Sequence, residues 1–409
     1  MSFQSSYALV PIGEVARFIN GDRSTNYPKG DDYVDDGTPF ISATELREGR
    51  IDYSGVRRIT SSSFERLRSG KIQRDDVLFC LRGSIGKIAY VKDGEVGAIA
   101  SSLVIVRATE RIDSRYLFFG LSSQAGQQAA MGLNNGAAQP NLSVGELQKI
   151  SLPLPPLPTQ RRIAGILSAY DELIENSQRR IKILESMARA LYREWFVNFR
   201  FPGHESVPRV PSPLGEIPKG WEVRKLGEVA EEMRRNVPKG LLEDPAPFVG
   251  LEHIPRRSLA LDNWESTTEL GSNKLEFKKG EVLFGKIRPY FHKVSVAPFD
   301  GLCSADTIVI RSRQPEHYAI VVGCVSSDDF VALATATSNG SKMPRANWTI
   351  LAEHHIATPP LTVARQFSAV IESAIAKMQT LVFQTQTLRR TRDLLLPRLL
   401  SGQIEVLPS

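Results

Sequence analysis

The sequence contains little cysteine and no long run of apolar residues. Its three cysteines, Cys80, Cys303 and Cys324, are odd in number and show no CxxC spacing. This pattern excludes a disulfide framework and is typical of a reducing cytosol. No apolar stretch approaches about 18 residues, so we expect no membrane span. The first residues also lack the charged start and apolar run of a signal peptide, and we therefore expect a cytoplasmic protein.

The motifs of nucleotide-binding and catalytic sites are also missing. Residues 83–87, Gly-Ser-Ile-Gly-Lys, have neither the spacing nor the following Ser or Thr of a phosphate-binding loop. Residues 358–361, Thr-Pro-Pro-Leu, differ at both ends from the Asn-Pro-Pro-aromatic run that holds a flipped base. His354 and His355 are adjacent, with no nearby cysteine or carboxylate pattern. The sequence therefore predicts no cofactor, no metal and no enzymatic activity of the chain itself.

Length and charge leave a large class of proteins open. The 409 residues are 42% hydrophobic and carry a net charge of +6. That length predicts two or three domains, and that composition is typical of a globular chain. The charge is mild for a nucleic-acid-binding protein but has the right sign, and an ordinary basic protein would also show it.

Two segments, 157–199 and 367–399, have the apolar periodicity of very long helices. Steps of three or four residues separate the members of each stripe, with one stutter in the first. The stripes contain Ile163, Ile166, Tyr170, Leu173, Ser177, Ile181, Leu184, Ala188, Leu191 and Trp195, and then Phe367, Val370, Ala374, Met378, Leu381, Thr385, Leu388, Arg392, Leu395 and Leu399. A helix of roughly 60 Å cannot bury such a stripe inside one small domain. We expect the two helices to pair as an antiparallel intramolecular coiled coil.

Prolines mark the limits of both predicted helices. Proline runs at 155–156 and 359–360 should end a globular unit and start each helix, because proline forces the preceding residue into extended geometry. Pro397 predicts that the second helix stops or kinks near its end. Arg392 lies on the predicted seam, where an arginine favours either pairing with an acid or a frayed end.

The two halves of the chain repeat one another in the same order, and the spacing drifts only at loops. The matching segments are 7–16 with 221–230, 39–41 with 247–249, 76–79 with 281–284, 100–107 with 304–311, 135–140 with 339–344, and 155–157 with 359–361. We infer an internal duplication.

Each half reads as mixed strand and helix, so the predicted class is α+β, with two duplicated domains separated by the two long helices. Strand-like runs are 77–81, 103–106, 282–284 and 307–310, and helical ones 114–122 and 316–325. The expected domains are residues 1–154, a central helix at 155–200, a connector with little regular structure at 201–220, a second domain at 221–357 and a C-terminal helix at 358–409.

The two domains share a framework but differ in the loops between the matching segments. Residues 20–30 differ from 233–240, and residues 80–87 differ from 285–293. A duplicated scaffold with two unlike sets of loops can recognise two different targets, at a distance fixed by the helices. On physical grounds this is a bipartite recognition device.

The segments 153–200 and 388–406 resemble the conserved regions of type I restriction-modification specificity subunits. The Gly-Glu-Val-Ala starts of the two halves (13–16 and 227–230) and the Val-Leu-Phe segments also resemble the target-recognition domains of that family. The resemblance covers nearly the whole chain. It implies a non-catalytic subunit that binds double-stranded DNA at a split, asymmetric target, and that docks two methyltransferase subunits and with them restriction subunits.

Candidate DNA-binding residues are the polar and basic side chains in the loops that differ between the halves. They are Arg82, Ser84, Lys87, Asn135, Gln139 and Asn141, and then Lys286, Arg288, Tyr290, Ser341, Lys342 and Arg345; weaker candidates are Thr44, Arg47, His253, Arg256 and Arg257. Arginine suits bidentate contact with guanine, and Asn or Gln suits adenine. Lysine and serine more often hold phosphates, which position a protein without specifying sequence.

Two other classes of function stay open at this point. One is the DNA-reading subunit of a related single-target restriction-methylation system, or a self-sufficient nuclease or methyltransferase, against which the missing catalytic motifs argue. The other is a coiled-coil adaptor that reads no DNA. Salt-dependent binding of duplex DNA would separate the adaptor from the others, because phosphate contacts give a steep salt dependence.

Overall fold

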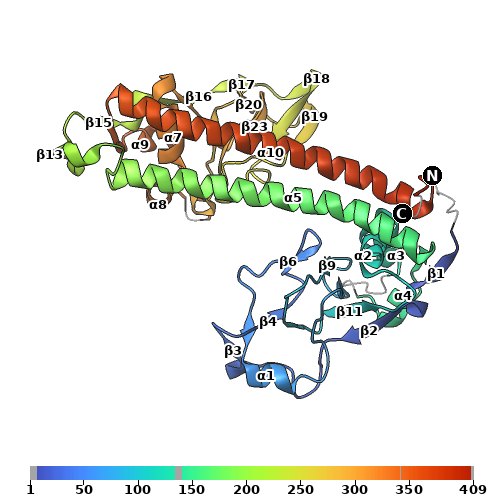
Figure 1. Ribbon diagram of the computed structural model, residues 1–409. Helices are drawn as coiled ribbons and strands as arrows, with labels where there is room; N and C mark the ends of the chain where they lie inside the picture. The colour runs from blue at the N-terminus through green and yellow to red at the C-terminus, as the bar shows by residue number, and fades with distance from the viewer. Residues whose placement is uncertain (1–6, 134–140, 341, 407–409) are drawn as a thin grey trace. The chain divides into compact units, whose positions relative to one another are not determined.

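The computed structural model describes residues 7–133, 141–340 and 342–406 (Figure 1). The chain forms two compact units: the first unit joins Met1–Glu172 to Leu388–Ser409, and the second unit is Leu173–Thr387. Helices and sheets are mixed in both, so the predicted α+β class is confirmed.

The central sheet of the first unit has four antiparallel strands in the order β2-β11-β8-β9. These are Ala16–Asn20, Leu103–Ala108, Val77–Cys80 and Ile88–Tyr90. A second sheet has the order β10-β4-β7-β3, built from Ala98–Ile99, Thr38–Ile41, Arg58–Ile59 and Tyr33–Val34. Two-stranded pairs complete the strands: β5 (Leu46–Arg47) with β6 (Arg50–Ile51), and β1 (Leu9–Pro11) with β12 (Ser151–Pro153).

Short helices of the first unit start where a side chain satisfies the free N–H groups of the first turn. They are α1 (Ser61–Arg66), α2 (Ser114–Ser122), α3 (Gln124–Gly132) and α4 (Val144–Gln148), capped by Thr60, Asp113, Ser123 and Ser143. Asp113, for example, accepts from the N–H groups of Arg115 and Tyr116, each at 3.0 Å. The helix predicted at 114–122 is thereby confirmed.

The second unit has a central sheet with the order β16-β24-β21-β22. Its strands are Ala230–Met233, Thr307–Ser312, Val282–Gly285 and Val294–Val296. A five-stranded sheet, β17-β20-β23-β18-β19, contains Arg235–Val237, Lys274–Phe277, Gly301–Ser304, Gly240–Val249 and Glu265–Leu270. The remaining elements are β15 (Glu222–Lys225) with β25 (His355–Thr358), α6 (Leu226–Val229), α7 (Tyr318–Val325), α8 (Asp328–Ala336) and α9 (Trp348–Leu351).

The central sheets of the two units have the same antiparallel plan. In the first, Val77 pairs with Val106 of β11 and Tyr90 of β9. In the second, Val282 pairs with Ile310 of β24 and Val296 of β22. The matching segments 76–79 and 281–284 therefore occupy the same place in their sheets.

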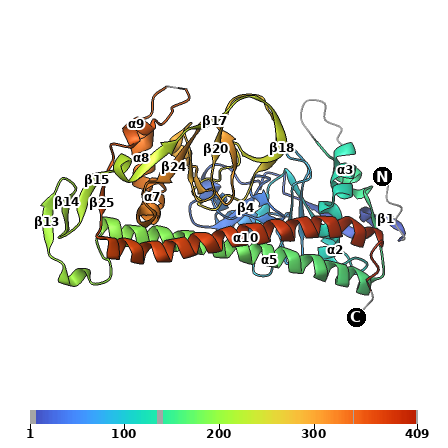
Figure 2. The same ribbon diagram turned by 90° about the horizontal axis from the view of Figure 1, so that it is seen from above.

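Two long helices, α5 (Leu157–Tyr192) and α10 (Leu361–Ser401), contribute residues to both units. Both begin directly after the proline runs, as predicted. In each unit a stretch of α5 lies alongside a stretch of α10 in the opposite direction (Figures 1 and 2). Arg392 donates to Asp171 at 2.5 Å in the first unit, so the seam arginine does pair with an acid.

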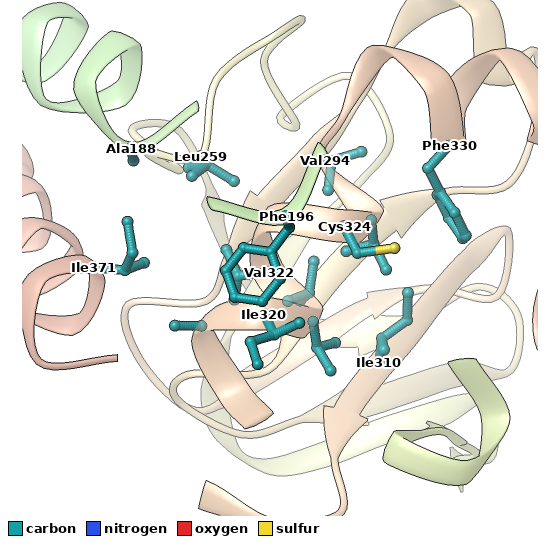
Figure 3. Packing of buried hydrophobic residues seen from close by; sticks show 14 of the residues in the cluster. Ala188, Phe196, Leu259, Val294, Ile310, Ile320, Val322, Cys324, Phe330 and Ile371 are labelled. Atoms are coloured by element: carbon teal, nitrogen blue, oxygen red, sulfur yellow. The ribbon is translucent and has the colours of Figure 1, made fainter. Parts of the chain in front are cut away.

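A π-turn, Arg193–Val197, ends α5 in the second unit and turns its aromatic residues into the core. The ring of Phe196 lies 4.7 Å from that of Phe367, near the start of α10. The same core cluster joins Ala188 of α5, Ile371 of α10, Leu259 and the apolar residues of α7 (Figure 3). The long helices are thus part of the domain core and not an appended rod.

Two of the predicted seam positions in the long helices are wrong. Leu173 and Val370 were placed on the seams but are 54% and 52% exposed, while their neighbours Ile174 and Ile371 are both 3% exposed. Each helix packs against the other helix and a globular core, so its buried face is wider than a coiled-coil seam and is displaced from it. The second helix runs through Pro397 and ends four residues later, at Ser401.

The connector between the halves is more regular than its composition predicts. Residues Arg209–Ser212 (β13) and Gly215–Pro218 (β14) form an antiparallel hairpin. Gly215, with φ of +90°, supplies the left-handed geometry that this tight turn requires.

Among the described residues, no single helix is long and apolar enough to cross a membrane. One bent pair, Pro315–Val325 with Asp328–Ala336, meets the length and composition criterion jointly across a 66° bend.

Candidate nucleic-acid interface

A tight loop at residues 82–87, the first contact loop, follows β8 in the first unit. The N–H of Cys80 donates to the carbonyl of Lys87 at 2.8 Å, and Lys87 N–H donates to Ser84 at 3.2 Å. Ile85 is buried and anchors the loop, whereas Arg82, Ser84 and Lys87 are exposed. Three of the predicted residues therefore stand together on one exposed turn.

A second predicted segment lies beside this loop. Arg82 and Asn141 form an isolated antiparallel bridge, and the N–H of Leu142 donates to Leu81 at 2.9 Å. Arg82 and Asn141, 59 positions apart by residue number, are thereby brought together with both side chains exposed. Asn135 and Gln139 lie outside the described residues.

The second unit repeats this arrangement with a longer loop. Residues 286–293, the second contact loop, follow β21, and Arg288 N–H donates to the carbonyl of Pro344 at 2.8 Å. Ala346 N–H donates to Lys286 at 2.9 Å, and Ile287 bridges to Arg345. In both units, the loop after the third strand in the sheet order thus contacts a matching segment further along the chain. The strand is β8 or β21, and the segment is 141–142 or 344–346.

The predicted side chains of the second contact loop differ in exposure. Tyr290 is 52% exposed, and Lys342 and Arg345 are exposed, whereas Lys286 and Arg288 are partly buried. Arg288 has φ of +50°, an uncommon left-handed conformation for an arginine. Ser341 lies outside the described residues.

Local contacts hold most of the weaker candidates. Arg47 pairs with Asp52 at 3.2 Å, and Thr44 Oγ1 donates to Glu45 at 2.7 Å. The ring Nδ1 of His253 accepts from its own turn, at the N–H of Gly250, at 3.0 Å. These side chains make contacts with turns in their own unit.

Arg256 and Arg257 instead support the second contact loop. The Arg256 guanidinium lies 4.1 Å from the centre of the Phe291 ring, and Arg257 N–H donates to the carbonyl of His292 at 2.8 Å. Burial, together with the nearby Arg256 charge, lowers the pKa of Lys293, and burial also lowers the pKa of His292. The base of this loop therefore contains several basic side chains, two of which, Arg257 and His292, lie beside the carboxylate of Asp328.

The sequence alone did not indicate two residues that support the contact loops. The amide of Gln127 donates to the carbonyl of Gly86 at 2.9 Å and so braces the first contact loop from 41 residues away. Asp306 pairs with Arg345 at 3.5 Å in the second unit. Neither lies in a motif, and only the folded chain brings them to the loops.

Within the described ranges, no cluster of three or more His, Cys, Asp or Glu side chains could hold a metal ion. The thiol of Cys80, next to the first contact loop, is buried, which raises its pKa, and Sγ donates to the carbonyl of Arg82 at 3.2 Å. The geometry at the loops is that of a polar, basic contact surface.

The chain is similar to proteins of known function. Residues 5–186 match the family described as type I restriction modification DNA specificity domain. The type I restriction enzyme MjaIX specificity subunit of Methanocaldococcus jannaschii is 24% identical, with 97% of this chain and 92% of the relative aligned. The EcoDI specificity subunit of Escherichia coli is 25% identical, with 91% and 82% aligned.

A solved structure shares the fold. The type I restriction-modification S subunit of M. genitalium has a TM-score of 0.61 at 14% identity, and the match covers 98% of this chain and 97% of that one. Residues 5–186 thus match a DNA specificity domain, and the relatives that align with most of the chain are specificity subunits of type I restriction enzymes, so the chain is similar to such subunits. Such subunits bind DNA and act together with partner subunits.

Proposed function

We propose that the chain reads a bipartite, asymmetric DNA target, with one half-site per target-recognition domain. The first domain is residues 1–154 and the second is 221–357. The observation that carries this proposal is the pair of central sheets with one strand order, β2-β11-β8-β9 and β16-β24-β21-β22, that present unlike loops at the same place. A common scaffold with different loops favours two different readings.

In this proposal the two domains arose by duplication, and the helices at 155–200 and 358–409 form an antiparallel coiled coil that spaces them, with residues 201–220 as the connector. The pairing of Asp171 with Arg392 and of Phe196 with Phe367 supports that arrangement within each unit. The spacing of the half-sites then depends on the length of the helices.

The residues that contact DNA are drawn from the two contact loops and the segments beside them. They are Arg82, Ser84, Lys87, Asn135, Gln139 and Asn141 for one half-site, and Lys286, Arg288, Tyr290, Ser341, Lys342 and Arg345 for the other. Arginine and asparagine read base edges in the major groove, and lysine and serine hold phosphates. The exposed positions of Arg82 and Asn141 on one bridge support a joint contact.

The proposed partners are double-stranded DNA, two methyltransferase subunits and, through them, restriction subunits. Exposed apolar side chains on the long helices, such as Met187 at 61% and Leu394 at 55%, support docking of protein partners there.

Exchange of residues 1–154 for those of another specificity subunit tests the proposal. The exchanged protein, expressed with its methyltransferase partner, should methylate sites in which one half-site has changed while the other half-site and the gap are retained. Sequencing of methylated positions in the host genome measures this. A change in both half-sites, or in neither, would overturn the proposal.

A further inference from the structure

Each unit contains a junction where a long helix contacts the segment that supports its contact loop. In the second unit this is Glu185 of α5, which is 6% exposed. Its Oε1 accepts from the hydroxyl of Ser258 at 2.5 Å and from the N–H groups of Leu259 at 2.7 Å and Ala260 at 3.1 Å. A buried carboxylate needs such donors, because burial of an unpaired charge is costly.

The segment held by Glu185 is bonded in turn to the strand after the second contact loop. Ser295 donates through its hydroxyl to the carbonyl of Ser258 at 2.8 Å, and Val296 N–H donates to Leu259 at 2.9 Å. Both Ser295 and Val296 belong to β22, which begins directly after residue 293. Glu185 thus fixes one end of the loop through a single intervening segment.

One turn further along α5, Arg189 donates to the carbonyl of Arg257. Arg257 N–H donates to His292 within the loop at 2.8 Å, and its guanidinium pairs with Asp328 at 2.9 Å. The helix therefore has two connected hydrogen-bonding routes to the second contact loop.

In the first unit the junction has the reverse polarity. Arg389 of α10 donates through Nη2 to both carboxylate oxygens of Glu48, at 3.2 and 3.3 Å. Glu48 lies in the turn between β5 and β6, next to Gly49. The N–H of Tyr90 in β9 donates to the carbonyl of Gly49 at 3.0 Å, and β9 begins directly after the first contact loop.

The two junctions occupy matching places. Tyr90 and Val296 match because they pair with Val77 and Val282 in their sheets. Their hydrogen bonds to Gly49 and Leu259 then match Glu48 with Ser258. Glu185 and Arg389 lie the same number of residues after the Pro-Pro-Leu segments that start their helices.

We propose that Glu185 and Arg389 are positioning residues that fix the contact loops relative to the long helices. Their opposite polarity makes each junction accept only its own domain. In the second unit, the carboxylate of Glu185 on α5 accepts hydrogen bonds from residues 258–260. In the first unit, the guanidinium of Arg389 on α10 donates to the carboxylate of Glu48. An acid at the Ser258 position would lose the hydroxyl donor to Glu185 and place two like charges side by side. This inference rests on the proposed half-site function.

The test uses the complex of the full chain with its methyltransferase partner and a library of near-cognate DNA sites. Glu185→Arg should reduce discrimination against mismatches in the half-site of the second domain by on the order of tenfold, the scale of one base-pair mismatch. Discrimination in the other half-site should stay unchanged. The double variant Glu185→Arg with Ser258→Glu pairs a helix arginine with a glutamate, as Arg389 and Glu48 do in the first unit. It should restore discrimination in the half-site of the second domain.

Two further variants sharpen the result. Ser186→Arg places an arginine at the exposed neighbouring position and should have no effect. Arg389→Glu should reduce discrimination in the half-site of the first domain only, and by less, because the Arg389–Glu48 pair is partly exposed. Should Glu185→Arg fail to assemble, Glu185→Gln, which keeps an acceptor but loses the charge, should give a partial loss at the same half-site.

Unchanged discrimination in the Glu185 variants would overturn the positioning role. An equal loss of methylation at all sites would do so too, since it indicates loss of stability alone. Exchange of residues 1–154 separates this failure from that of the proposed function. If the exchange changes one half-site while Glu185→Arg affects neither, only the junction inference is wrong.

Discussion

Arg107 holds the buried carboxylate of Asp76 through two hydrogen bonds, from Nε to Oδ1 at 2.7 Å and from Nη2 to Oδ2 at 2.9 Å. The matching acid of the second unit, Glu281, is held in the same bidentate way by Arg235, at 2.8 and 2.6 Å. The acid has the same place in both sheets, but its arginine comes from β11 in one and β17 in the other. The two units therefore satisfy one structural requirement by different contacts.

Replacement of Arg107 by alanine should lower the free energy of unfolding by about 2–3 kcal/mol, because it leaves the carboxylate of Asp76 buried without its charged donor. Urea unfolding followed by far-UV circular dichroism measures this, since all four tryptophans lie in the second unit. Arg311 is the matched control: it aligns with Arg107 but pairs with the more exposed Glu231, so Arg311→Ala should cost less than about 1 kcal/mol. Equal losses would contradict the argument.

The substitution Gly323→Ala should destabilise the second unit by about 1–3 kcal/mol, because the new Cβ would meet Cδ2 of Tyr192 at 2.3 Å. The aromatic ring of Tyr192 packs against Phe196 and Phe367 and has little room to move. Thermal unfolding followed by tryptophan fluorescence measures the loss. Gly165 of α5 has open space around it, so Gly165→Ala should be neutral or stabilising by up to about 1 kcal/mol. An unchanged melting temperature for Gly323→Ala would show that α7 and α5 are not in close contact.

The long elements were predictable from the sequence, and the reasons are local. The proline runs set the starts of α5 and α10. The choice between Leu173 and Ile174 was not predictable, because both satisfy steps of three or four and only the position of the globular core decides.

The candidate site was predictable in part. Unlike loops between matching segments pointed to Arg82 and Asn141, which the fold does bring together. The residues that hold those loops were not predictable. Glu185 and Ser258 are 73 residues apart, and nothing in either local sequence indicates the other.

Acidification should destabilise the second unit through three histidines, of which His292 and His317 are buried and His354 is partly buried. Burial lowers the pKa of His292, His317 and His354 below the ordinary value of 6.5, so the unfolded chain binds more protons than the folded one near that pH. Their contribution to stability is complete above pH 6.5 and is lost as the pH falls through 6.5 toward the folded pKa values. Urea midpoints from tryptophan fluorescence between pH 8 and pH 5 should therefore decline.

The substitution His292→Asn should make that decline shallower. Asparagine tolerates the left-handed backbone at this position, where φ is +52°, but it does not titrate. His204→Asn on the connector controls for the loss of a histidine and should change stability by less than about 0.5 kcal/mol. A decline with the same slope in His292→Asn would exclude His292 as its source.

Asp171 and Arg392 form an ion pair between the long helices. Removal of one partner should lower the free energy of unfolding more than replacement of both. Asp171→Ala leaves Arg392, which is 28% exposed, without its 2.5 Å contact between the long helices, and should cost about 1–2 kcal/mol. The pair Asp171→Leu with Arg392→Leu should be close to neutral, because apolar residues fit the adjoining core of the first unit. A double-mutant cycle with Asp171→Leu and Arg392→Leu, made singly and together and measured by urea unfolding and circular dichroism, gives the coupling energy. Additive single losses would show that the two residues do not interact.

Base and phosphate contacts should respond differently to mutation in the assembled complex. Lys342→Ala, at an exposed position beside the second contact loop, should weaken DNA binding equally for all sequences and reduce the slope of log K against log salt by about 1. Arg82→Ala should instead relax specificity at one position of one half-site, at a cost of about 1–3 kcal/mol. Lys377→Ala, exposed on α10, is the matched control and should leave both slope and specificity unchanged. Binding titrations at several salt concentrations separate the two kinds of contact, and an unchanged slope for Lys342→Ala would remove that lysine from the phosphate-binding set.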